Sequence, residues 1–336
     1  MAERFGKYRL LHRVGVGGMA EVFVAETHGA QGFVKRVVIK RILPAFNQDP
    51  AFVRMFINEA RVAAKLQHAN IVQIFDFDHV GETYYIAMEW VDGTDLRRLG
   101  DAVRVRRMPV PLPLAVHVGV ETLKGLHHAH TRGEAGEPLH VVHRDISPHN
   151  LLVSFSGEVK IADFGIAKVA ALATGSSSGM LKGKLTYMAP EQLDGRGVDC
   201  RSDLFSLGIV LWELLAGRRL YSTDGSEGEV IERVRQAEIP ALSSFNPEVS
   251  AELEAVLRRM LARDPNHRFP TAARALAELS RFARVGDALQ VAEYLSRLLP
   301  AEVHREERGR TEPLEETTAT FAEAAPEEPT RTRGLR

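Results

Sequence analysis

The sequence predicts two lobes of mixed class, a small strand-rich lobe followed by a larger helical lobe. Residues 1–90 contain runs rich in β-branched and aromatic side chains, whereas apolar residues at helical spacing dominate from residue 112 onward. The chain has 336 residues, of which 45% are hydrophobic, so it can bury a substantial core. Residues 91–94 are the predicted joint between the lobes.

Five segments of the first lobe are predicted strands separated by turns. They are residues 8–14, 21–27, 34–42, 71–78 and 83–91. One helix is expected to interrupt them over residues 51–66, where Phe52, Phe56 and Ala63 fall at helical spacing.

The second lobe is predicted to consist mainly of helices. They are residues 114–131, 200–216, 227–236, 249–261 and 271–282. Residues 171–184 are small, polar and rich in glycine and serine, which predicts a mobile loop. A further amphipathic helix over 286–299 has two interpretations, docking on the helical lobe or binding a partner. Residues 301–336 are predicted to be a disordered tail.

The composition excludes several classes of protein. With 43 basic and 44 acidic residues the net charge is -1, which argues against general affinity for nucleic acid or anionic membranes. Cys200 is the only cysteine, so an internal disulfide framework and a cysteine-rich zinc site are excluded. No export signal or membrane segment is visible, and we expect a soluble, cytoplasmic chain.

A glycine-rich stretch, Gly15-Val16-Gly17-Gly18, lies between the first two predicted strands. Backbone N–H groups can approach phosphates where no β-carbon intervenes, although a plain β-hairpin explains the stretch equally well on its own. A dinucleotide-binding loop is disfavoured, because a strand follows rather than a helix. Lys40, near the end of the strand 34–42, could be a surface cation or could pair with Glu59 of the predicted helix.

Three later motifs carry a sharper chemical signal. In His143-Arg144-Asp145-Ile146-Ser147-Pro148-His149-Asn150, Asp145 and Asn150 can face one site, one accepting a hydroxyl proton and the other binding a metal ion. In Asp163-Phe164-Gly165 the carboxylate can bind Mg²⁺, and Ala189-Pro190-Glu191 follows the predicted loop.

In this order the motifs resemble those of the eukaryotic-type protein kinase family, and of its bacterial serine/threonine members in particular. The resemblance covers residues 8–282. It implies an α+β, bilobal kinase fold with a small antiparallel sheet and one regulatory helix over 8–90, a hinge over 91–94, and a mainly α-helical lobe over 95–282.

The resemblance also implies ATP and Mg²⁺ as cofactors and assigns roles to individual residues. Asp145 would accept or orient the hydroxyl proton, and Lys40, paired with Glu59, would hold the ATP phosphates. Asn150 and Asp163 would hold the metal. Glu191 would pair with Arg268, and Asp203 would anchor the catalytic loop. The implied nucleotide contacts are Val14, Gly15, Val16, Gly17, Gly18, Ala20, Val22, Val38, Lys40, Met88 as gatekeeper, Glu89, Val91 and Leu152.

Four positions depart from the family pattern. Ala20 replaces the third glycine of the loop, and Val38 replaces the usual alanine before the lysine. More informative, Ser147 stands where serine/threonine kinases usually have lysine, and Lys184 stands where they usually have threonine. In the family fold these two side chains touch, so the cation and the hydroxyl have exchanged places. Our hypothesis is that Lys184 supplies the catalytic cation and Ser147 the hydroxyl contact.

Regulation and partners follow from the same resemblance. Arg144 is expected to bind a phosphate on the activation loop, which offers Thr174, Ser176 and Ser178 as acceptors, unless these residues form only a flexible linker. The expected partners are protein substrates and a second copy of the chain for trans-autophosphorylation. An ATP-binding pseudokinase scaffold, a kinase of small molecules and tyrosine specificity remain as alternatives.

Overall fold

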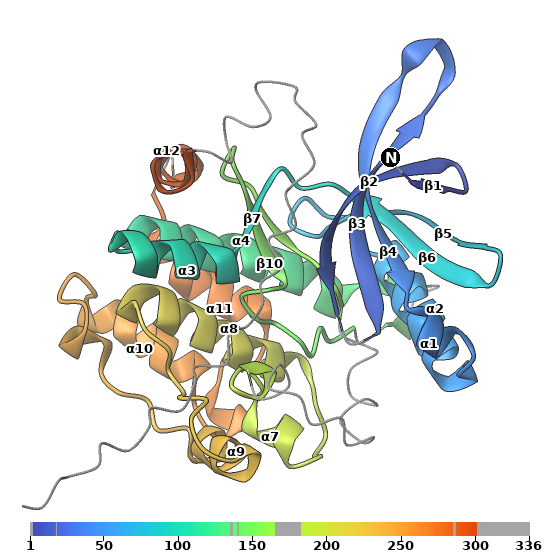
Figure 1. The fold of residues 1–336 in the computed structure, drawn as a ribbon. Coiled ribbons are helices and arrows are strands. Elements are labelled where there is room, and N and C mark those ends of the chain that lie inside the picture. The colour runs from blue at the N-terminus through green and yellow to red at the C-terminus, as the bar shows by residue number, and fades with distance from the viewer. Residues whose placement is uncertain are drawn as a thin grey trace, which may run out of the picture.

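The computed structural model describes residues 3–17, 19–134, 137–139, 141–164, 183–284 and 287–300. A β-sheet forms the first lobe and helices form most of the second, in the order of the chain (Figure 1). The protein kinase type of fold implied by the motifs, with a small antiparallel sheet and one long helix in the first lobe, is confirmed.

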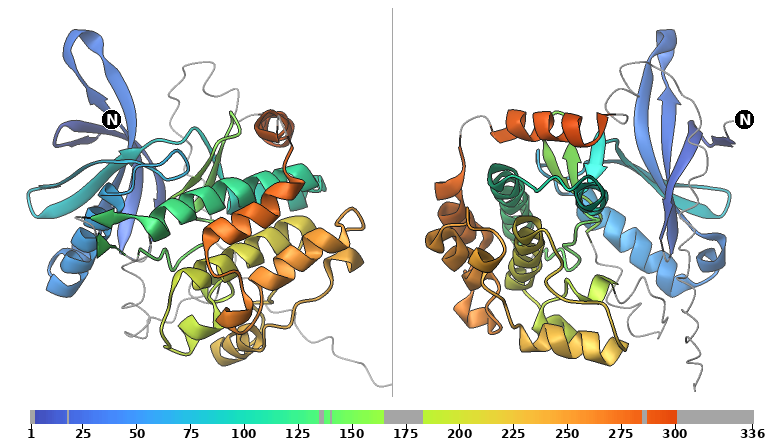
Figure 2. Two further views of the ribbon diagram at one scale, coloured as in Figure 1. Left: turned by 180° about the vertical axis from the view of Figure 1, so that it is seen from behind. Right: turned by 60° about the vertical axis from the view of Figure 1, so that its left-hand side comes forward.

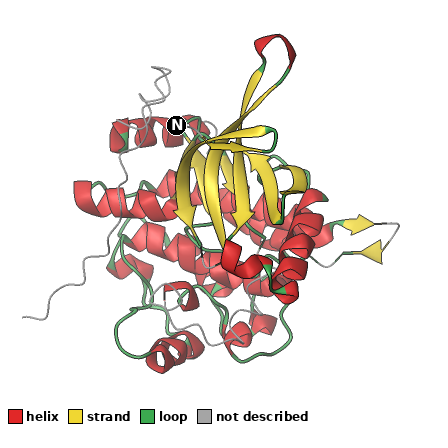
Figure 3. Cartoon of the chain, turned by 45° about the vertical axis from the view of Figure 1, so that its right-hand side comes forward, coloured by secondary structure: helices red, strands yellow, loops and turns green. Residues whose placement is uncertain are grey.

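The first lobe is built on a six-stranded antiparallel sheet with the order β1-β2-β3-β4-β6-β5 (Figure 3). Its strands are β1 (Glu3–Phe5), β2 (Tyr8–Val16), β3 (Ala20–His28), β4 (Val34–Ile42), β5 (Ile74–Val80) and β6 (Thr83–Glu89). Side chains alternate between the two faces of a strand, so Val37 and Ile39 join one apolar cluster while Val38 and Ile42 join the other. Lys40 belongs to the second face, which helix α2 covers.

Helix α2 (Pro50–Ala64) begins at a proline and is capped by Asp49, whose carboxylate accepts a hydrogen bond from the Ala51 amide at 2.8 Å. Its buried residues are Phe56, Glu59, Ala60 and Ala63. These residues lie on one face of the helix. Because the other three are apolar, the packing of this face against the sheet also buries the Glu59 carboxylate. A short helix, α1 (Pro44–Asn47), and a 3-10 turn, η1 (Ala30–Gly32), complete the lobe.

The second lobe packs around α4 and α8. Its helices are α3 (Leu96–Arg106), α4 (Leu112–Thr131), α7 (Pro190–Leu193), α8 (Cys200–Ala216), α9 (Glu227–Gln236), α10 (Ala251–Met260), α11 (Ala272–Leu279) and α12 (Asp287–Leu298), with 3-10 turns η2 (Leu242–Ser244), η3 (Pro265–His267) and η4 (Ser280–Phe282). Most residues of α8 are buried, whichever face of the helix they lie on, so this helix forms the centre of the helical lobe.

A three-stranded sheet, β11-β10-β7, lies between the helical lobe and the first lobe. Its strands are β7 (Gly93–Asp95), β10 (Leu151–Ser154) and β11 (Val159–Ile161), and a separate hairpin joins β8 (Gly133–Glu134) to β9 (Glu137–Pro138). The Val72 amide donates to the Ile161 carbonyl at 2.9 Å, and the Ile161 amide donates to the Asn70 carbonyl at 2.9 Å. These bonds join the segment before β5 to the strand that leads to Asp163.

Helix α12 docks on the helical lobe, across α3 and α4 (Figure 2). Val291, Tyr294 and Leu295 are buried there, and the Tyr294 hydroxyl donates to the Met108 carbonyl at 3.1 Å. Gly157 lies against this helix with a φ of +88°, and a β-carbon on it would come within 2.0 Å of the Ala288 carbonyl oxygen. The apolar face of residues 287–298 is therefore covered by the chain itself.

The clearest differences between the observed and the predicted elements concern α3 and β5. Helix α3 was not predicted. The strand predicted over 71–78 begins at Ile74, because Ile71 and Val72 contact Ile161 instead. Residues 165–182, which include most of the predicted loop, and the tail 301–336 lie outside the described residues. Within the described part of the chain, no helix is both long enough and apolar enough to cross a membrane.

Candidate active site

The turn between β2 and β3 holds the glycine-rich stretch. The Gly17 amide donates to the Ala20 carbonyl at 2.7 Å, and Gly15 lies opposite Val22 across the two strands. A β-carbon added to Gly15 would meet nothing within 4 Å, so packing within the chain does not require glycine there. This open backbone, with Val14 and Val16 exposed beside it, is what an approaching phosphate needs. Gly18 lies outside the described residues.

An apolar cluster lies below this turn, where the two lobes meet. Val38 of β4 is the direct cross-strand partner of Met88 of β6. Val38, Val91 and Leu152 are only partly buried and pack against the cluster that contains Met88. Side chains from β4, from the segment after β6 and from β10 therefore present apolar surface in one place, while Val22 is partly buried on β3. An aromatic ring could be held between such surfaces.

Lys40 lies between two carboxylates. Its Nζ is 2.7 Å from Glu59 Oε1 and 2.9 Å from Asp163 Oδ1, and its side chain is 12% exposed. Burial alone lowers the pKa of a lysine, but the charges of Asp163 and Glu59 outweigh it and raise the pKa of Lys40 above its ordinary value. The lysine is therefore a fixed cation, held by one residue of each lobe.

Asp203 of α8 holds the loop of residues 143–150 in place through hydrogen bonds. The Asp203 carboxylate is buried and accepts hydrogen bonds from the amides of His143 and Arg144, both at 2.8 Å, and contacts His130 Nε2 at 2.9 Å. Burial works to raise the pKa of Asp203, but the hydrogen bonds and the nearby imidazoles prevail, and the pKa is lowered. Arg144 has a φ of 65°, a strained value that these bonds help to hold.

His143 connects this loop to Asp163. Its Nδ1 accepts from the Asp145 amide at 3.2 Å, so its Nε2, 3.1 Å from the Ala162 carbonyl, is the protonated nitrogen of a neutral ring. The ring also packs on Phe164, with ring centroids 4.6 Å apart. Asp163 has a φ of 53°, which is again unusual for a residue with a β-carbon.

Asp145 and Asn150 are brought together by the turn between them. Asn150 Nδ2 donates to Asp145 Oδ2 at 2.6 Å and to the Asp145 carbonyl at 2.7 Å. The Ala162 amide donates to the Asn150 carbonyl at 2.8 Å, which keeps Asn150 next to the backbone that precedes Asp163. The amide nitrogen of Asn150 is thus occupied, and its oxygen and the Asp163 carboxylate are the hard oxygen donors that Mg²⁺ prefers. These residues fit a magnesium ion.

The segment of residues 189–193 is also held in place, by an ion pair and hydrogen bonds. Glu191 accepts two hydrogen bonds from Arg268, at 2.7 and 2.9 Å, and one from the Ser202 hydroxyl at 2.6 Å. Gln192 Nε2 donates to the Arg144 carbonyl at 3.0 Å. Residues 189–193 therefore contact both the core of the helical lobe and the loop that carries Asp145.

The resemblance predicts that the side chains of Lys184 and Ser147 touch, but the Ser147 hydroxyl forms no hydrogen bond with Lys184 in the described part of the chain. The Ser147 hydroxyl is buried and has no hydrogen-bond partner among the described residues. Partial burial, together with the positive charge of Lys184, lowers the pKa of His149, while Asp145 acts on the same imidazole in the opposite direction. The charges of Lys184 and Asp145 therefore both act on the imidazole of His149.

Arg144 combines a fixed backbone with an unsatisfied side chain. Its Nε atom is buried and has no hydrogen-bond partner within the part of the chain that the structure describes. Thr174, Ser176 and Ser178, the predicted phosphate acceptors, lie outside the described residues.

Two contributors to the site were not assigned from the sequence. His130 supports Asp203 from the last turn of α4, and His143 orients the backbone of Asp145 and the ring of Phe164. His143 stands inside a motif and could have been singled out. His130 has no local signal, because only the packing of α4 on α8 brings it to Asp203.

Comparison with known proteins agrees with this arrangement. Residues 8–279 match the protein kinase domain family. The chain is 41% identical over 329 residues to the tyrosine-protein kinase MasK of Myxococcus xanthus, covering 97% of this chain and 51% of MasK. It is 34% identical over 267 residues to the serine/threonine-protein kinase PrkC of Bacillus subtilis, covering 80% of this chain and 39% of PrkC. The chain thus spans about half of the length of MasK and 39% of the length of PrkC.

A solved structure shows the same likeness. The kinase domain of Mycobacterium tuberculosis PknI superposes with a TM-score of 0.62 at 28% identity, covering 83% of this chain and 97% of that domain.

Proposed function

Because the chain belongs to the protein kinase domain family, we propose that it transfers the γ-phosphoryl group of Mg-ATP to serine and threonine hydroxyls of proteins. One observation carries the proposal: Lys40 bridges Glu59 and Asp163 while Asp145 is held by Asn150, so five charged or polar groups from both lobes meet in ordered geometry. Relatives named as serine/threonine-protein kinases, at 34% and 38% identity, support the same acceptor.

The nucleotide would lie where the two lobes meet. The adenine ring would be held between Val22 and Val38 above and Leu152 below, and Met88 would close the back of this site. The backbone groups of Glu89 and Val91 would meet the polar edge of the ring. The open glycine turn would cover the phosphates, and the Lys40 ammonium would hold two of them while Glu59 keeps it in place.

Asn150 and Asp163 would hold the magnesium ion. When bound, Mg²⁺ neutralises the charge of the phosphate oxygens and helps to align the γ-phosphoryl group. Asp145 would accept, or orient, the proton of the attacking hydroxyl. Its carboxylate is positioned by Asn150, and its backbone amide by His143, so the acceptor group meets a base that is already oriented.

Lys184 would provide a second cation for the transferring phosphoryl group. Charge gathers on the phosphoryl oxygens during transfer, and a preorganised ammonium stabilises it. The support is that the charges of Lys184 and Asp145 both act on the imidazole of His149. At the position where serine/threonine kinases usually have lysine, this chain has the smaller Ser147, which would leave space for the Lys184 ammonium. The Ser147 hydroxyl is buried and has no hydrogen-bond partner within the described residues.

Tyrosine is a second candidate acceptor, because MasK, with 41% identity, is named as a tyrosine kinase and because the usual lysine is replaced by Ser147. An ATP-binding scaffold without activity is opposed by the presence of Lys40, Asp145 and Asp163. A small-molecule kinase is opposed by the anchored segment after Ala189, which resembles a ledge for peptides.

Control by phosphorylation of the activation loop is part of the proposal. The buried Nε of Arg144 would meet a phosphate on Thr174, Ser176 or Ser178, transferred by a second copy of the chain. Signalling in the cytoplasm, where ATP is available, would be the setting, with protein substrates as partners and no nucleic acid.

The first test is the intact mass of the purified chain before and after incubation with Mg-ATP, beside Asp145→Asn. Gain of mass in steps of one phosphate, absent from the variant, supports the proposal. Phosphoamino-acid analysis of the product then separates serine and threonine from tyrosine. Failure to modify the chain or any protein substrate, with ATP still raising the melting temperature, would support the scaffold instead.

A further inference from the structure

A pocket adjoins the loop that carries Asp145. Its volume is about 260 Å³, and its wall includes Pro148 of this loop and Tyr187 of the segment after Lys184. The Pro148 carbonyl accepts a hydrogen bond from the Arg97 amide at 3.2 Å, which ties the start of α3 to the loop. Pro148 is three positions after Asp145, so their Cα atoms are at most about 11 Å apart. A peptide with its hydroxyl at Asp145 would therefore reach this pocket within a few residues.

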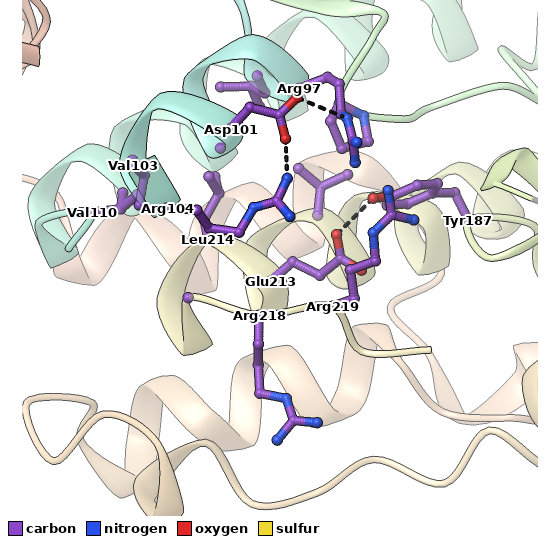
Figure 4. A pocket seen from close by; sticks show the side chains of 15 residues that line it. Arg97, Asp101, Val103, Arg104, Val110, Tyr187, Glu213, Leu214, Arg218 and Arg219 are labelled. Carbon is purple, nitrogen blue, oxygen red and sulfur yellow. Dashed lines mark hydrogen bonds and ion pairs between the residues drawn. The ribbon is translucent and has the colours of Figure 1, made fainter. Parts of the chain in front are cut away.

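The wall of the pocket is basic (Figure 4). Arg97, Arg104 and Arg219 line it, and Asp101 is shared between the first two: Arg97 Nε lies 3.3 Å from its carboxylate, and Arg104 also forms an ion pair with it. Arg218 turns away and lies over the ring of Phe245 at 5.2 Å. One carboxylate thus serves two guanidinium groups.

The second carboxylate of the pocket, that of Glu213, is hydrogen-bonded by groups other than the arginines. It accepts from the Tyr187 hydroxyl at 2.6 Å and from the Leu220 amide at 3.0 Å. Burial also raises the pKa of Glu213. Both carboxylate oxygens of Glu213 therefore accept hydrogen bonds from groups other than Arg219.

Arg219 is the unsatisfied member of the group. Its Nη1 atom is buried and has no hydrogen-bond partner in the described part of the chain. Its charge acts on both Tyr187 and Glu213, as does that of Arg97, and Figure 4 shows the side chains of Arg97 and Arg219 beside Tyr187. An anionic oxygen placed there would satisfy Nη1 and balance the excess positive charge.

Size and shape limit what could supply this oxygen. The pocket is smaller than the 300–1,000 Å³ typical of sites for drug-sized ligands, and it matches a single side chain better. Apolar residues of α3 and α8, including Val103 and Leu214, form part of its wall and could contact methylene carbons.

We propose that this pocket recognises an acidic side chain of the protein substrate, a few residues from the accepted hydroxyl, with Arg219 as the specificity-determining residue. The anion could be a carboxylate or a phosphate already present on the substrate, since both accept hydrogen bonds from guanidinium. The proposal rests on the proposed protein kinase activity, and it names the class of substrate that this activity would prefer.

The test is a positional scan with the full chain. Peptides with one serine acceptor carry glutamate, phosphoserine, alanine or lysine at each position on either side of it, and kcat/KM is measured for each. We expect glutamate or phosphoserine at one position to raise kcat/KM about ten-fold or more over alanine, as one charge-assisted hydrogen bond would. Comparison of these two side chains separates a carboxylate-binding from a phosphate-binding pocket.

Variants then assign the preference to the pocket. Arg219→Met keeps the bulk and should reduce the ratio of acidic to alanine peptide to about one, whereas Arg219→Glu should make lysine the favoured residue at that position. Arg274→Met, an exposed arginine of α11, is the matched control and should keep the ratio unchanged. Circular dichroism and the melting temperature establish that each variant is folded.

The possible failures are distinct. Equal kcat/KM for all peptides, or a preference that survives Arg219→Met and Arg219→Glu, overturns the inference while leaving kinase activity intact. No transfer to any peptide or to the chain itself overturns the proposed function.

Discussion

Glu191 and Arg268 form a two-bonded ion pair in the interior of the helical lobe, although 77 residues separate them in the chain. The guanidinium side chain is 0% exposed and the carboxylate side chain is 7% exposed. Arg268 also donates to the carbonyls of Arg201, Ala262 and Arg263. Nearly every donor of the guanidinium is therefore satisfied, and the segment after the activation loop is fixed to the core.

Removal of this guanidinium should cost more stability than any surface pair. Arg268→Met leaves the Glu191 carboxylate buried without its partner, and we expect a loss of about 3–5 kcal/mol in the free energy of unfolding. Urea denaturation measures it. Arg281→Met breaks the exposed pair with Glu278 and should cost about 1 kcal/mol or less. Equal losses for the two variants would contradict this view of the buried pair.

Asp203 should make stability depend on pH in the acid range. Its pKa in the folded protein is lowered from the ordinary value of 3.8. A group with a lowered folded pKa contributes stability that is present above the unfolded pKa and is lost as pH falls through the folded pKa. Asp203→Asn leaves one of the amides of His143 and Arg144 facing an NH₂ group, and should cost about 2 kcal/mol or more at neutral pH.

The difference between this variant and the parent chain should shrink as pH falls below about 3.8. Urea midpoints measured from neutral pH downward show it, and Glu278→Gln, at an exposed position, serves as the control. A difference that stays constant with pH would mean that ionisation of Asp203 does not contribute.

Because Lys40 bridges two carboxylates, substitutions of Lys40 and of Glu59 should reduce kcat/KM for ATP to different extents. Lys40→Met removes the cation that would hold the phosphates and should lower kcat/KM for ATP by about 100-fold or more. Glu59→Gln keeps the lysine and the second carboxylate, Asp163, so a smaller loss of about ten-fold is expected, mainly through a raised KM. Lys124→Met, at a partly exposed pair with Glu121, is the control. Full activity of Lys40→Met in a peptide assay would refute the role.

The two-lobed fold was predictable because the patterns that define it are local. Alternation in residues 34–42 and helical spacing in residues 51–66 each place apolar side chains on one face, and both elements are present as β4 and α2. Helix α3 was missed because its sequence is dominated by arginine and contains Gly100. Only three residues, Leu96, Leu99 and Val103, are buried there, so packing against the lobe decides the structure.

In the candidate site, the sequence motifs identify individual residues but do not predict how these residues are arranged relative to one another. Lys40 and Asp163 are 123 positions apart, and no periodicity predicts that their side chains meet. The basic pocket around Arg219 escaped notice for the same reason, because its arginines come from α3 and from the turn after α8. Each is an ordinary charged residue in its own segment, and only the fold brings them together.

Phosphorylation of the activation loop should act through Arg144. Replacement of Thr174, Ser176, Ser177 and Ser178 by alanine should lower the activity reached after preincubation with ATP, because no phosphate would then meet the guanidinium. Arg144→Gln should lower it to a similar level. If both changes act on one contact, the combined variant should be no worse than either alone. Additive losses, or unchanged rates in the alanine variant, would contradict control by this contact.

The exchange between Ser147 and Lys184 makes the most specific prediction. Lys184→Met should lower kcat for peptide phosphorylation by about ten-fold or more, with little change in the KM for ATP, because the ammonium would act on the phosphoryl group only during transfer. Ser147→Lys alone would bring two ammonium groups to one site and should also lose activity.

The double variant, Ser147→Lys with Lys184→Thr, restores the arrangement usual in serine/threonine kinases and should be more active than either single change. Such a result requires that the two positions interact, because independent effects would add. Lys124→Met controls for loss of a lysine elsewhere on the surface. Full kcat in Lys184→Met would show that the ammonium is only a solvated charge, and a double variant as poor as the sum of its parts would show that the two positions act separately.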